Sequence, residues 1–276
     1  METFGRRLRT AMDTRGPLCV GIDPHAGLLE RWGLTDDVAG LERFTFTVVE
    51  ALADRVAVLK PQSAFFERFG SRGIAVLESA IRQSREAGAL VLLDVKRGDI
   101  GSTMAAYADA YLDPDSSLCA DAITVSPYLG VGSLRPAFDA AAIHGGGVFV
   151  LALTSNPEGP TVQHAQTAAG RTVAQTVIDE ISQLNAGADE LGSVGLVVGA
   201  TIGETGHDLS RVHGPLLAPG LGAQGGDPAG LAKIFGGSLR NVLPSYSREV
   251  LSAGPDAAAL RAAADRAVAA CRAVIG

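Results

Sequence analysis

The chain has 276 residues, of which 47% are hydrophobic and 19% charged, so it can bury a full core and is not a disordered segment. Its 23 basic and 30 acidic residues give a formal net charge of −7, which argues against a general surface for nucleic acid or anionic membranes. No apolar run approaches the ~20 residues of a membrane span, and the first residues lack the apolar region of a secretory signal.

Eight short apolar runs, bounded by polar or glycine residues, alternate with helical patterns along the chain. Continuous apolar runs of this length are typical of strands covered on both faces, as in a parallel sheet. In chain order the predicted strands are residues 18–23, 56–61, 90–96, 122–127, 148–155, 194–201, 216–222 and 241–245.

Amphipathic helices are predicted between these strands and after the last one. One begins near Asp36 or Asp37, another ends at Gly88, and the last begins near Asp256. Their apolar stripes are Leu41, Phe44, Val48 and Leu52; Ile74, Leu77 and Ile81; and Leu260, Ala264, Val268 and Cys271. Eight strands alternating with helices predict one α/β domain over residues 1–276, a (β/α)8 barrel rather than an open doubly wound sheet.

A barrel of this kind carries its chemistry at the C-terminal ends of the strands, and phosphate often binds after strands seven and eight. Polar residues near the ends of the predicted strands are therefore the candidates for a site. They are Asp23, Lys60, Asp94, Lys96, Ser126, Thr154 and Ser155, with residues 220–226 and 245–248.

Lysine is rare in this chain: only Lys60, Lys96 and Lys233 occur among the 23 basic residues. Two of the three stand at the ends of apolar strands. A lysine ammonium can give up a proton, whereas a guanidinium effectively cannot, so these positions indicate proton transfer. The alternative is that both lysines line the barrel with their stems and extend their charged ends to solvent.

Asp94 and Lys96 are two residues apart on one strand, so their side chains are expected on the same face. Lys60 ends the preceding strand and Asp99 follows in the loop, and the four charges sum to zero. A buried network of this kind is tolerable only when its members are paired. Neighbouring carboxylates favour the ammonium form of Lys96, whereas a Schiff-base lysine needs an apolar or cationic neighbourhood. The pattern therefore favours Lys96 as a general acid.

Residues 220–225 read Gly-Leu-Gly-Ala-Gln-Gly and match the G-x-G-x-x-G pattern. A dinucleotide site expects this pattern after the first strand, and here it follows the seventh. Backbone N–H groups with Gln224 as a further donor predict a phosphate site, and Arg248 after the eighth strand could grip the same phosphate. The alternative is a glycine turn for close packing beside an ordinary surface arginine.

The remaining reactive residues show no site pattern. The five histidines lack metal-ligand spacing, and Cys19, Cys119 and Cys271 form neither a disulfide framework nor a zinc site. So few cysteines suit a reducing, cytoplasmic location. Residues 155–166, after the fifth strand, could close over a substrate or form a solvated loop.

The segment Asp94-Val-Lys96-Arg-Gly-Asp99-Ile100 resembles the D-x-K-x-x-D-I signature of the orotidine 5′-phosphate decarboxylase family, among the ribulose-phosphate-binding barrels. The longer loops resemble its bacterial branch that includes actinobacterial enzymes. One departure is Ser247, where many relatives have glycine before the arginine. The similarity continues in chain order through Asp23, Lys60, Thr103, Ser155, the Pro219–Gly226 segment with Gln224, and Arg248.

This resemblance implies decarboxylation of orotidine 5′-monophosphate to UMP in pyrimidine biosynthesis, with neither cofactor nor metal. It implies that Lys96 protonates C6 of the pyrimidine while Asp94 lies against the departing carboxylate. Lys60 is expected to bind ribose and orient Asp94, and Asp23 to contact a ribose hydroxyl.

The resemblance also implies a homodimer, in which Asp99 and Thr103 reach the ribose in the neighbouring subunit's site. The other residues expected to bind substrate are Ser155 at the pyrimidine, Gln224 and Arg248 at the phosphate, and Pro219 beside them.

Two alternatives remain open. The first is a sugar-phosphate decarboxylase or aldolase of the same superfamily. The ketogulonate-phosphate decarboxylases of that superfamily have glutamate in place of Lys60, use magnesium, and carry His and Arg after strand five. This chain has Thr154-Ser155-Asn156-Pro157 there, which disfavours that reading. The second is a non-catalytic barrel that binds a nucleotide without turning it over.

Overall fold

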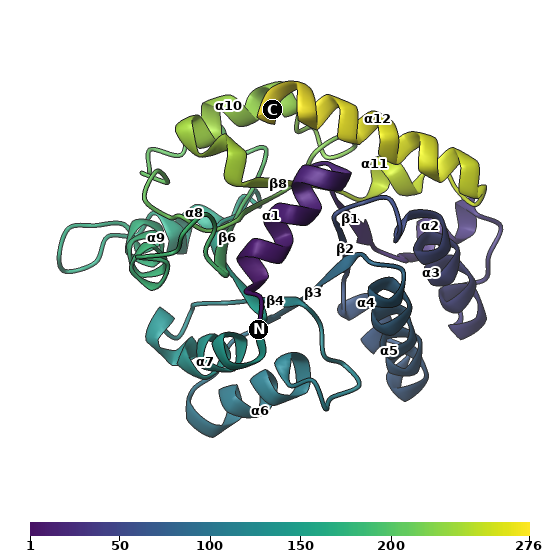
Figure 1. Cartoon of the computed structure of the whole chain (residues 1–276), viewed down its shortest axis with the longest axis horizontal. Helices are drawn as coiled ribbons and strands as arrows, with labels where there is room; N and C mark the ends of the chain where they lie inside the picture. The colour runs from purple at the N-terminus through teal and green to yellow at the C-terminus, as the bar shows by residue number, and fades with distance from the viewer.

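Eight parallel strands pair in sequence order and close into a barrel, with β8 pairing back onto β1 (Figure 1). The computed structural model describes all residues from 1 to 276. The strands are β1 (Cys19–Ile22), β2 (Val58–Pro61), β3 (Leu90–Arg97), β4 (Ala122–Val125), β5 (Gly147–Leu153), β6 (Val194–Val198), β7 (Leu216–Pro219) and β8 (Val242–Tyr246). The eight predicted strands and the (β/α)8 barrel are confirmed.

Helices surround the barrel and connect its strands. They are α1 (Phe4–Arg15), α2 (Ala26–Arg31), α3 (Val38–Leu52), α4 (Ala64–Glu67), α5 (Gly70–Glu86), α6 (Gly101–Leu112), the 3₁₀ turn η1 (Val131–Leu134), α7 (Arg135–His144), α8 (Gly159–Gln163), α9 (Val173–Leu184), α10 (Pro228–Phe235), the 3₁₀ turn η2 (Gly236–Asn241), α11 (Arg248–Leu251) and α12 (Ala257–Ile275). None of them combines the length and the apolarity needed to cross a bilayer.

The three helices predicted from apolar stripes are confirmed as α3, α5 and α12. The side chain of Asp37 accepts a hydrogen bond from the Gly40 N–H at the start of α3, and Asp256 caps α12 in the same way. Gly88 follows the end of α5 at a φ of +96°, a conformation that glycine adopts without strain.

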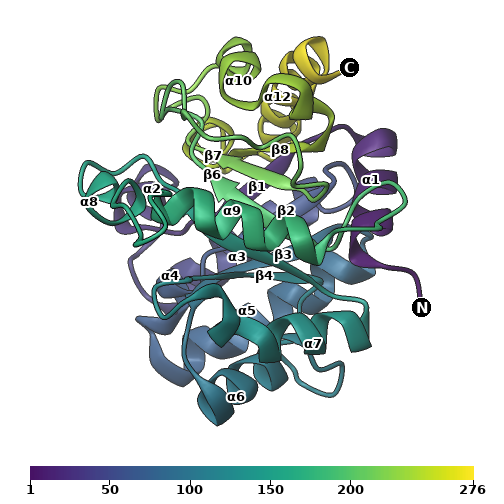
Figure 2. The same ribbon diagram turned by 90° about the vertical axis from the view of Figure 1, so that its left-hand side faces the viewer.

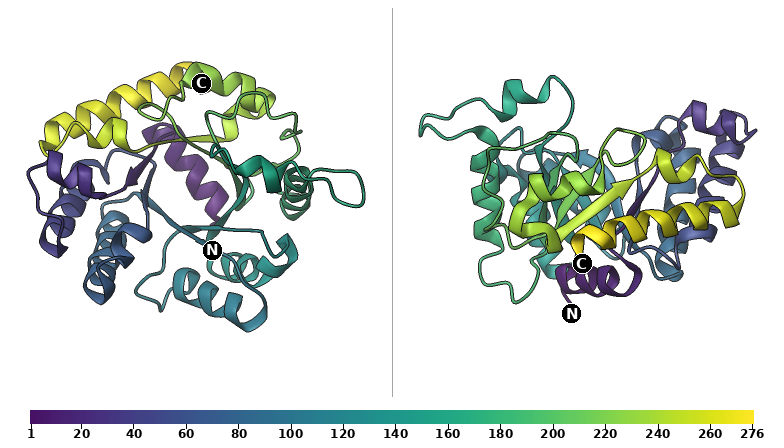
Figure 3. Two further views of the ribbon diagram at one scale, coloured as in Figure 1. Left: turned by 180° about the vertical axis from the view of Figure 1, so that it is seen from behind. Right: turned by 90° about the horizontal axis from the view of Figure 1, so that it is seen from above.

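Helix α1, which was not among the predicted elements, closes one end of the barrel. Phe4, Leu8 and Met12 recur every four residues and are buried against the inward-facing side chains of the strands. The Phe4 and Phe149 rings meet edge to face at 6.0 Å. Figure 2 and the right panel of Figure 3 show α1 at one end of the barrel and α8 at the other. The N-terminal ends of the strands are therefore covered by α1.

Strands β6 and β7 end earlier than predicted, at Val198 and Pro219. Directly after β6, Gly199 N and Ala200 N still donate hydrogen bonds to Leu153 O and Pro219 O of the neighbouring strands. After β7, Gly220 takes a φ of +106° and the chain turns there. These extra residues form loops at the same end of the barrel.

Candidate active site

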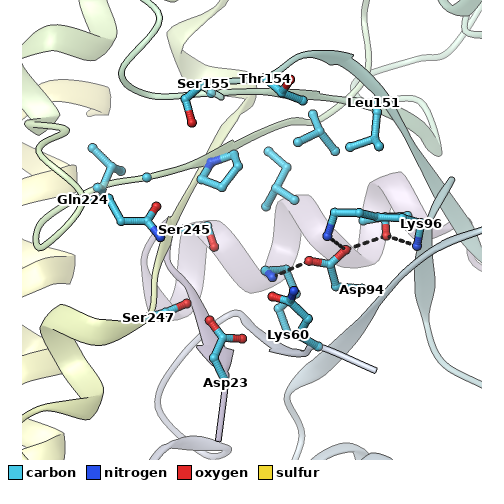
Figure 4. A pocket seen from close by; sticks show the side chains of 18 of the residues that line it. Asp23, Lys60, Asp94, Lys96, Leu151, Thr154, Ser155, Gln224, Ser245 and Ser247 are labelled. Atoms are coloured by element: carbon cyan, nitrogen blue, oxygen red, sulfur yellow. Dashed lines mark hydrogen bonds and ion pairs between the residues drawn. The ribbon is translucent and has the colours of Figure 1, made fainter. Parts of the chain in front are cut away.

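A cavity of about 200 Å³ lies at the C-terminal ends of the strands, and all eight strands or their following loops contribute to its wall (Figure 4). Eight of the ten residues predicted for the site line it. They are Asp23, Lys60, Asp94, Lys96, Ser155, Pro219, Gln224 and Arg248. The C-terminal ends of the strands thus bring together residues that are up to 225 positions apart in the chain.

Asp94 is the centre of the polar side of this cavity. Its Oδ2 lies 2.8 Å from Lys60 Nζ, and its Oδ1 lies 2.6 Å from Lys96 Nζ and 2.7 Å from Thr124 Oγ1. The side chains of Asp94 and Lys60 are 8% and 6% exposed, whereas that of Lys96 is 46% exposed. Lys96 therefore presents its ammonium to the cavity, while Lys60 is held beneath it.

The charges of this group stabilise one another. Burial by itself raises the pKa of the Asp94 carboxyl, but the ammonium groups of Lys60 and Lys96 outweigh burial and hold that pKa well below its usual range. Burial by itself lowers the pKa of Lys60, but the Asp94 and Asp23 carboxylates outweigh it and raise that pKa above its usual range. Asp94 and Lys60 are both ionised at neutral pH.

Apolar side chains make up another part of the cavity wall. Such a surface excludes water and strengthens the electrostatic interactions beside it. The apolar residues are Leu151, Leu153, Val197 and Leu217.

The glycine-rich loop after β7 is a tight turn that uses several of its own N–H groups. Gly222 N donates to Gly226 O, Gly225 N to Gly222 O and Gly226 N to Gly220 O. These three donors are therefore occupied within the turn itself. The N–H groups of Ala223 and Gln224 have no backbone partner in the chain, and both residues line the cavity.

Arg248 begins α11 directly after β8, and its exposed side chain belongs to the same side of the cavity wall as the glycine-rich loop. Ser247 precedes it and also lines the cavity. The Ser247 hydroxyl makes no capping bond to α11, and its Oγ would lie 2.1 Å from a Cβ atom built on Gly21. A side chain at residue 21 would therefore displace Ser247.

The loop after β5 is held to its strand by one side chain. Gln163, at the end of α8, accepts a hydrogen bond from Thr154 N at 3.0 Å and donates one to Thr154 Oγ1 at 2.6 Å. Ser155 follows and is exposed on the cavity wall (Figure 4). The segment is thus ordered by Thr154 and Gln163 rather than being only a solvated loop.

Asp99 and Thr103 do not reach the cavity of their own chain. Asp99 Oδ1 accepts a hydrogen bond from Ile100 N, and Thr103 is exposed on α6. The predicted four-residue charge network is therefore wrong for a single chain: Lys60, Asp94 and Lys96 come together without Asp99. Asp99 stands in the turn after β3 and is not part of the cavity wall.

Several cavity residues are absent from the predicted site residues. Thr124 is the most important of them, because it bonds Asp94. The candidate chosen on that strand, Ser126, lies two residues further on and does not line the cavity. Gln62, Ser245 and Ser247 line it as well. Gln62 is two residues after Lys60, so the two-residue period of a strand would have predicted that both side chains face the barrel interior. Thr124 lies within an apolar strand, and no sequence pattern marks it as a site residue.

No group of three or more His, Cys, Asp or Glu side chains is placed to hold a metal ion. The three cysteines are buried and unpaired.

Comparisons with known proteins agree with this architecture. The sequence model of the family described as orotidine 5′-phosphate decarboxylase / HUMPS matches residues 16–263. The orotidine 5′-phosphate decarboxylase of Salinispora arenicola is 77% identical over 275 residues, covering 100% of this chain and 99% of the relative, and that of Streptomyces coelicolor is 66% identical, covering 96% of each. The crystal structure of a Streptomyces avermitilis relative superposes with a TM-score of 0.98 at 63% identity, covering 100% of this chain and 96% of the other. The chain belongs to the orotidine 5′-phosphate decarboxylase / HUMPS family.

Proposed function

We propose that this chain decarboxylates orotidine 5′-monophosphate to UMP, without a cofactor, as a carboxy-lyase of pyrimidine biosynthesis. The observation that carries this proposal is the Lys60–Asp94–Lys96 group, in which one buried carboxylate is paired to two ammonium groups at the cavity wall. The relatives named for this activity share 66–77% of their residues with the chain.

In the proposed reaction the bond from C6 to the carboxylate breaks, and its electron pair stays on C6 as carbon dioxide leaves. The Lys96 ammonium then donates a proton to C6, and the neutral amine regains one from solvent. A fixed ammonium beside the developing negative charge lowers the barrier without any reorganisation at that moment. Asp94 lies against the carboxylate that departs, and Lys60 orients Asp94 and contacts ribose.

The phosphate is assigned to the opposite part of the wall. Gln224 and Arg248 are exposed there beside Pro219, and a guanidinium can hold two phosphate oxygens at once. Asp23 is assigned to a ribose hydroxyl because its Oδ1 is buried with no hydrogen-bond partner in the chain. Ser155 is assigned to the pyrimidine ring.

We also infer that the active form is a homodimer in which Asp99 and Thr103 complete the partner's site. Three large apolar side chains near them are exposed: Ile100 at 62%, Tyr128 at 80% and Leu129 at 52%. A second copy of the chain would cover this apolar surface.

We further infer that the chain works as one barrel domain over residues 1–276, because α1 closes the barrel and α12 packs back against α3. The three unpaired, buried cysteines fit the cytoplasmic location proposed for this reaction.

The activity is tested by following the absorbance of orotidine 5′-monophosphate with purified, metal-free protein. We expect turnover that EDTA leaves unchanged. Tight UMP binding with no turnover would support the non-catalytic barrel instead. Borohydride added with substrate should leave the protein unlabelled, and a trapped adduct on Lys96 would support a Schiff-base aldolase.

The shared site is tested by mixing two inactive variants, Lys96→Ala and Asp99→Ala. If Asp99 acts in the partner's site, subunit exchange restores about a quarter of wild-type activity, because half of the dimers are mixed and each has one intact site. If Asp99 acts within its own chain, mixing restores nothing.

A further inference from the structure

Thr124 is the single β4 residue that faces an irregularity in β3. Leu93 pairs with Ile123, and the next pair along the two strands is Arg97 with Val125. Three β3 residues, Asp94, Val95 and Lys96, therefore stand opposite one residue of β4. Irregularities of this kind are frequent beside active sites, where they redirect a side chain.

Lys96 has an unusual backbone conformation within this irregular segment. Its φ is +46°, in the left-handed region that residues with a Cβ atom rarely adopt. The Lys96 N–H donates a hydrogen bond to Thr124 Oγ1 at 3.0 Å, and the Lys96 Nζ returns to Asp94 at 2.6 Å. The hydroxyl of Thr124 thus anchors the backbone at the residue that carries the ammonium.

The direction of both hydrogen bonds at Thr124 follows from the groups involved. A backbone N–H can only donate and an ionised carboxylate can only accept, so the hydroxyl accepts from Lys96 N and gives its single proton to Asp94 Oδ1. Thr124 is 1% exposed and β-branched, which leaves its hydroxyl little freedom to turn elsewhere.

We propose that Thr124 is a positioning residue for the reaction: its hydroxyl fixes the distance and angle between the Asp94 carboxylate and the Lys96 ammonium. It acts through these two residues, and no contact with the substrate is needed. This inference rests on the proposed decarboxylation. Removing the hydroxyl leaves Asp94 with two donors instead of three and leaves the Lys96 N–H without its acceptor.

Two matched pairs of variants test the proposal, because the members of each pair differ only at the hydroxyl, which valine replaces with a methyl group and alanine with hydrogen. They are wild type against Thr124→Val, and Thr124→Ser against Thr124→Ala. We expect loss of the hydroxyl to lower kcat about 10- to 100-fold in each pair. We expect KM and the Kd for UMP to change by less than about threefold, because substrate binding does not use Thr124. If Thr124→Val does not fold, the serine and alanine variants still decide.

The outcomes separate this inference from the proposed function. Wild-type protein without turnover would contradict the function itself. Active wild type with an equally active Thr124→Val would overturn the positioning role. Equal loss of kcat in Thr124→Ser and Thr124→Val would also overturn it, since the methyl packing rather than the hydroxyl would then matter. A high kcat in Thr124→Ser with a low kcat in Thr124→Val supports it.

Discussion

Lys60 Nζ lies 2.8 Å from Asp94 Oδ2, and neither side chain is more than 8% exposed. A pair withdrawn from water to this degree is stable only while both members are charged and bonded, because a lone charge in the same place would be strongly disfavoured. Loss of either charge would therefore destabilise the barrel and also remove a group that the proposed reaction needs.

The contribution of this pair to the free energy of unfolding should not change with pH near neutrality. The lowered pKa of Asp94 contributes stability that is present above about pH 4 and is lost as the pH falls toward the pKa of Asp94 in the folded protein. The raised pKa of Lys60 contributes stability that is present below about pH 10 and is lost as the pH rises toward the pKa of Lys60 in the folded protein. Between these limits the contribution is constant.

Lys60→Met tests the contribution of this pair. We expect it to lower the free energy of unfolding by about 3–5 kcal/mol at pH 8, and by less at pH 5, because the variant lacks the ammonium that contributes most to lowering the pKa of Asp94. Urea denaturation at both pH values measures this. The control is Arg82→Met, which removes an exposed pair with Glu86 at 3.4 Å and should cost less than about 1 kcal/mol. The same loss at pH 5 and pH 8 would contradict the explanation.

Lys96→Ala should keep UMP binding and lose turnover. Proton donation by a positioned group is worth about 100- to 10,000-fold, so kcat should fall at least that far. Lys96→Arg should not restore the rate, since a guanidinium keeps the charge but does not release a proton. The third lysine, Lys233, is exposed on α10, and Lys233→Ala is the matched control that should leave kcat unchanged. Normal turnover by Lys96→Ala would refute the general-acid role.

Arg248→Ala should mainly weaken the use of substrate. Hydrogen bonds to a charged group are worth about 1.5–3 kcal/mol, so kcat/KM should fall about 10- to 100-fold or more. Free phosphite dianion should restore part of the rate with a substrate that lacks the phosphate, and it should do so better in wild type than in the variant. Arg240→Ala, at an exposed pair with Glu190, is the control. An unchanged kcat/KM in Arg248→Ala would count against the phosphate assignment.

Gln163→Ala should loosen the loop that carries Ser155. The variant loses both hydrogen bonds to Thr154, so we expect KM to rise about threefold to tenfold with a smaller change in kcat. Gln163→Glu keeps the acceptor for Thr154 N and should fall between wild type and alanine. Thr161→Ala, exposed on the same short helix, serves as the control. A fall in kcat at constant KM would show that the loop acts on the chemistry instead.

The order of strands and helices and the end of the barrel that carries the site can be predicted from the amino-acid pattern. Apolar runs mark the strands, the stripes on α3, α5 and α12 mark the helices, and the closure of a parallel barrel brings every strand end to one place. Lys60, Asp94, Lys96 and Arg248 can therefore be assigned to one cavity from the sequence alone. The four-residue repeat of Phe4, Leu8 and Met12 would also have revealed α1, although not the surface it covers.

The contacts between individual side chains could not be predicted in the same way. The extra residues in β3, the left-handed φ of Lys96 and the hydroxyl of Thr124 depend on how two strands align, and strand alignment is not encoded in the pattern of either strand alone. The separation of Asp99 from Lys96 has the same origin, since the turn that follows Arg97 sets the direction of Asp99. Local periodicity reports which face a residue occupies, whereas hydrogen bonds of 2.7–3.0 Å between strands depend on the relative position of those strands in space.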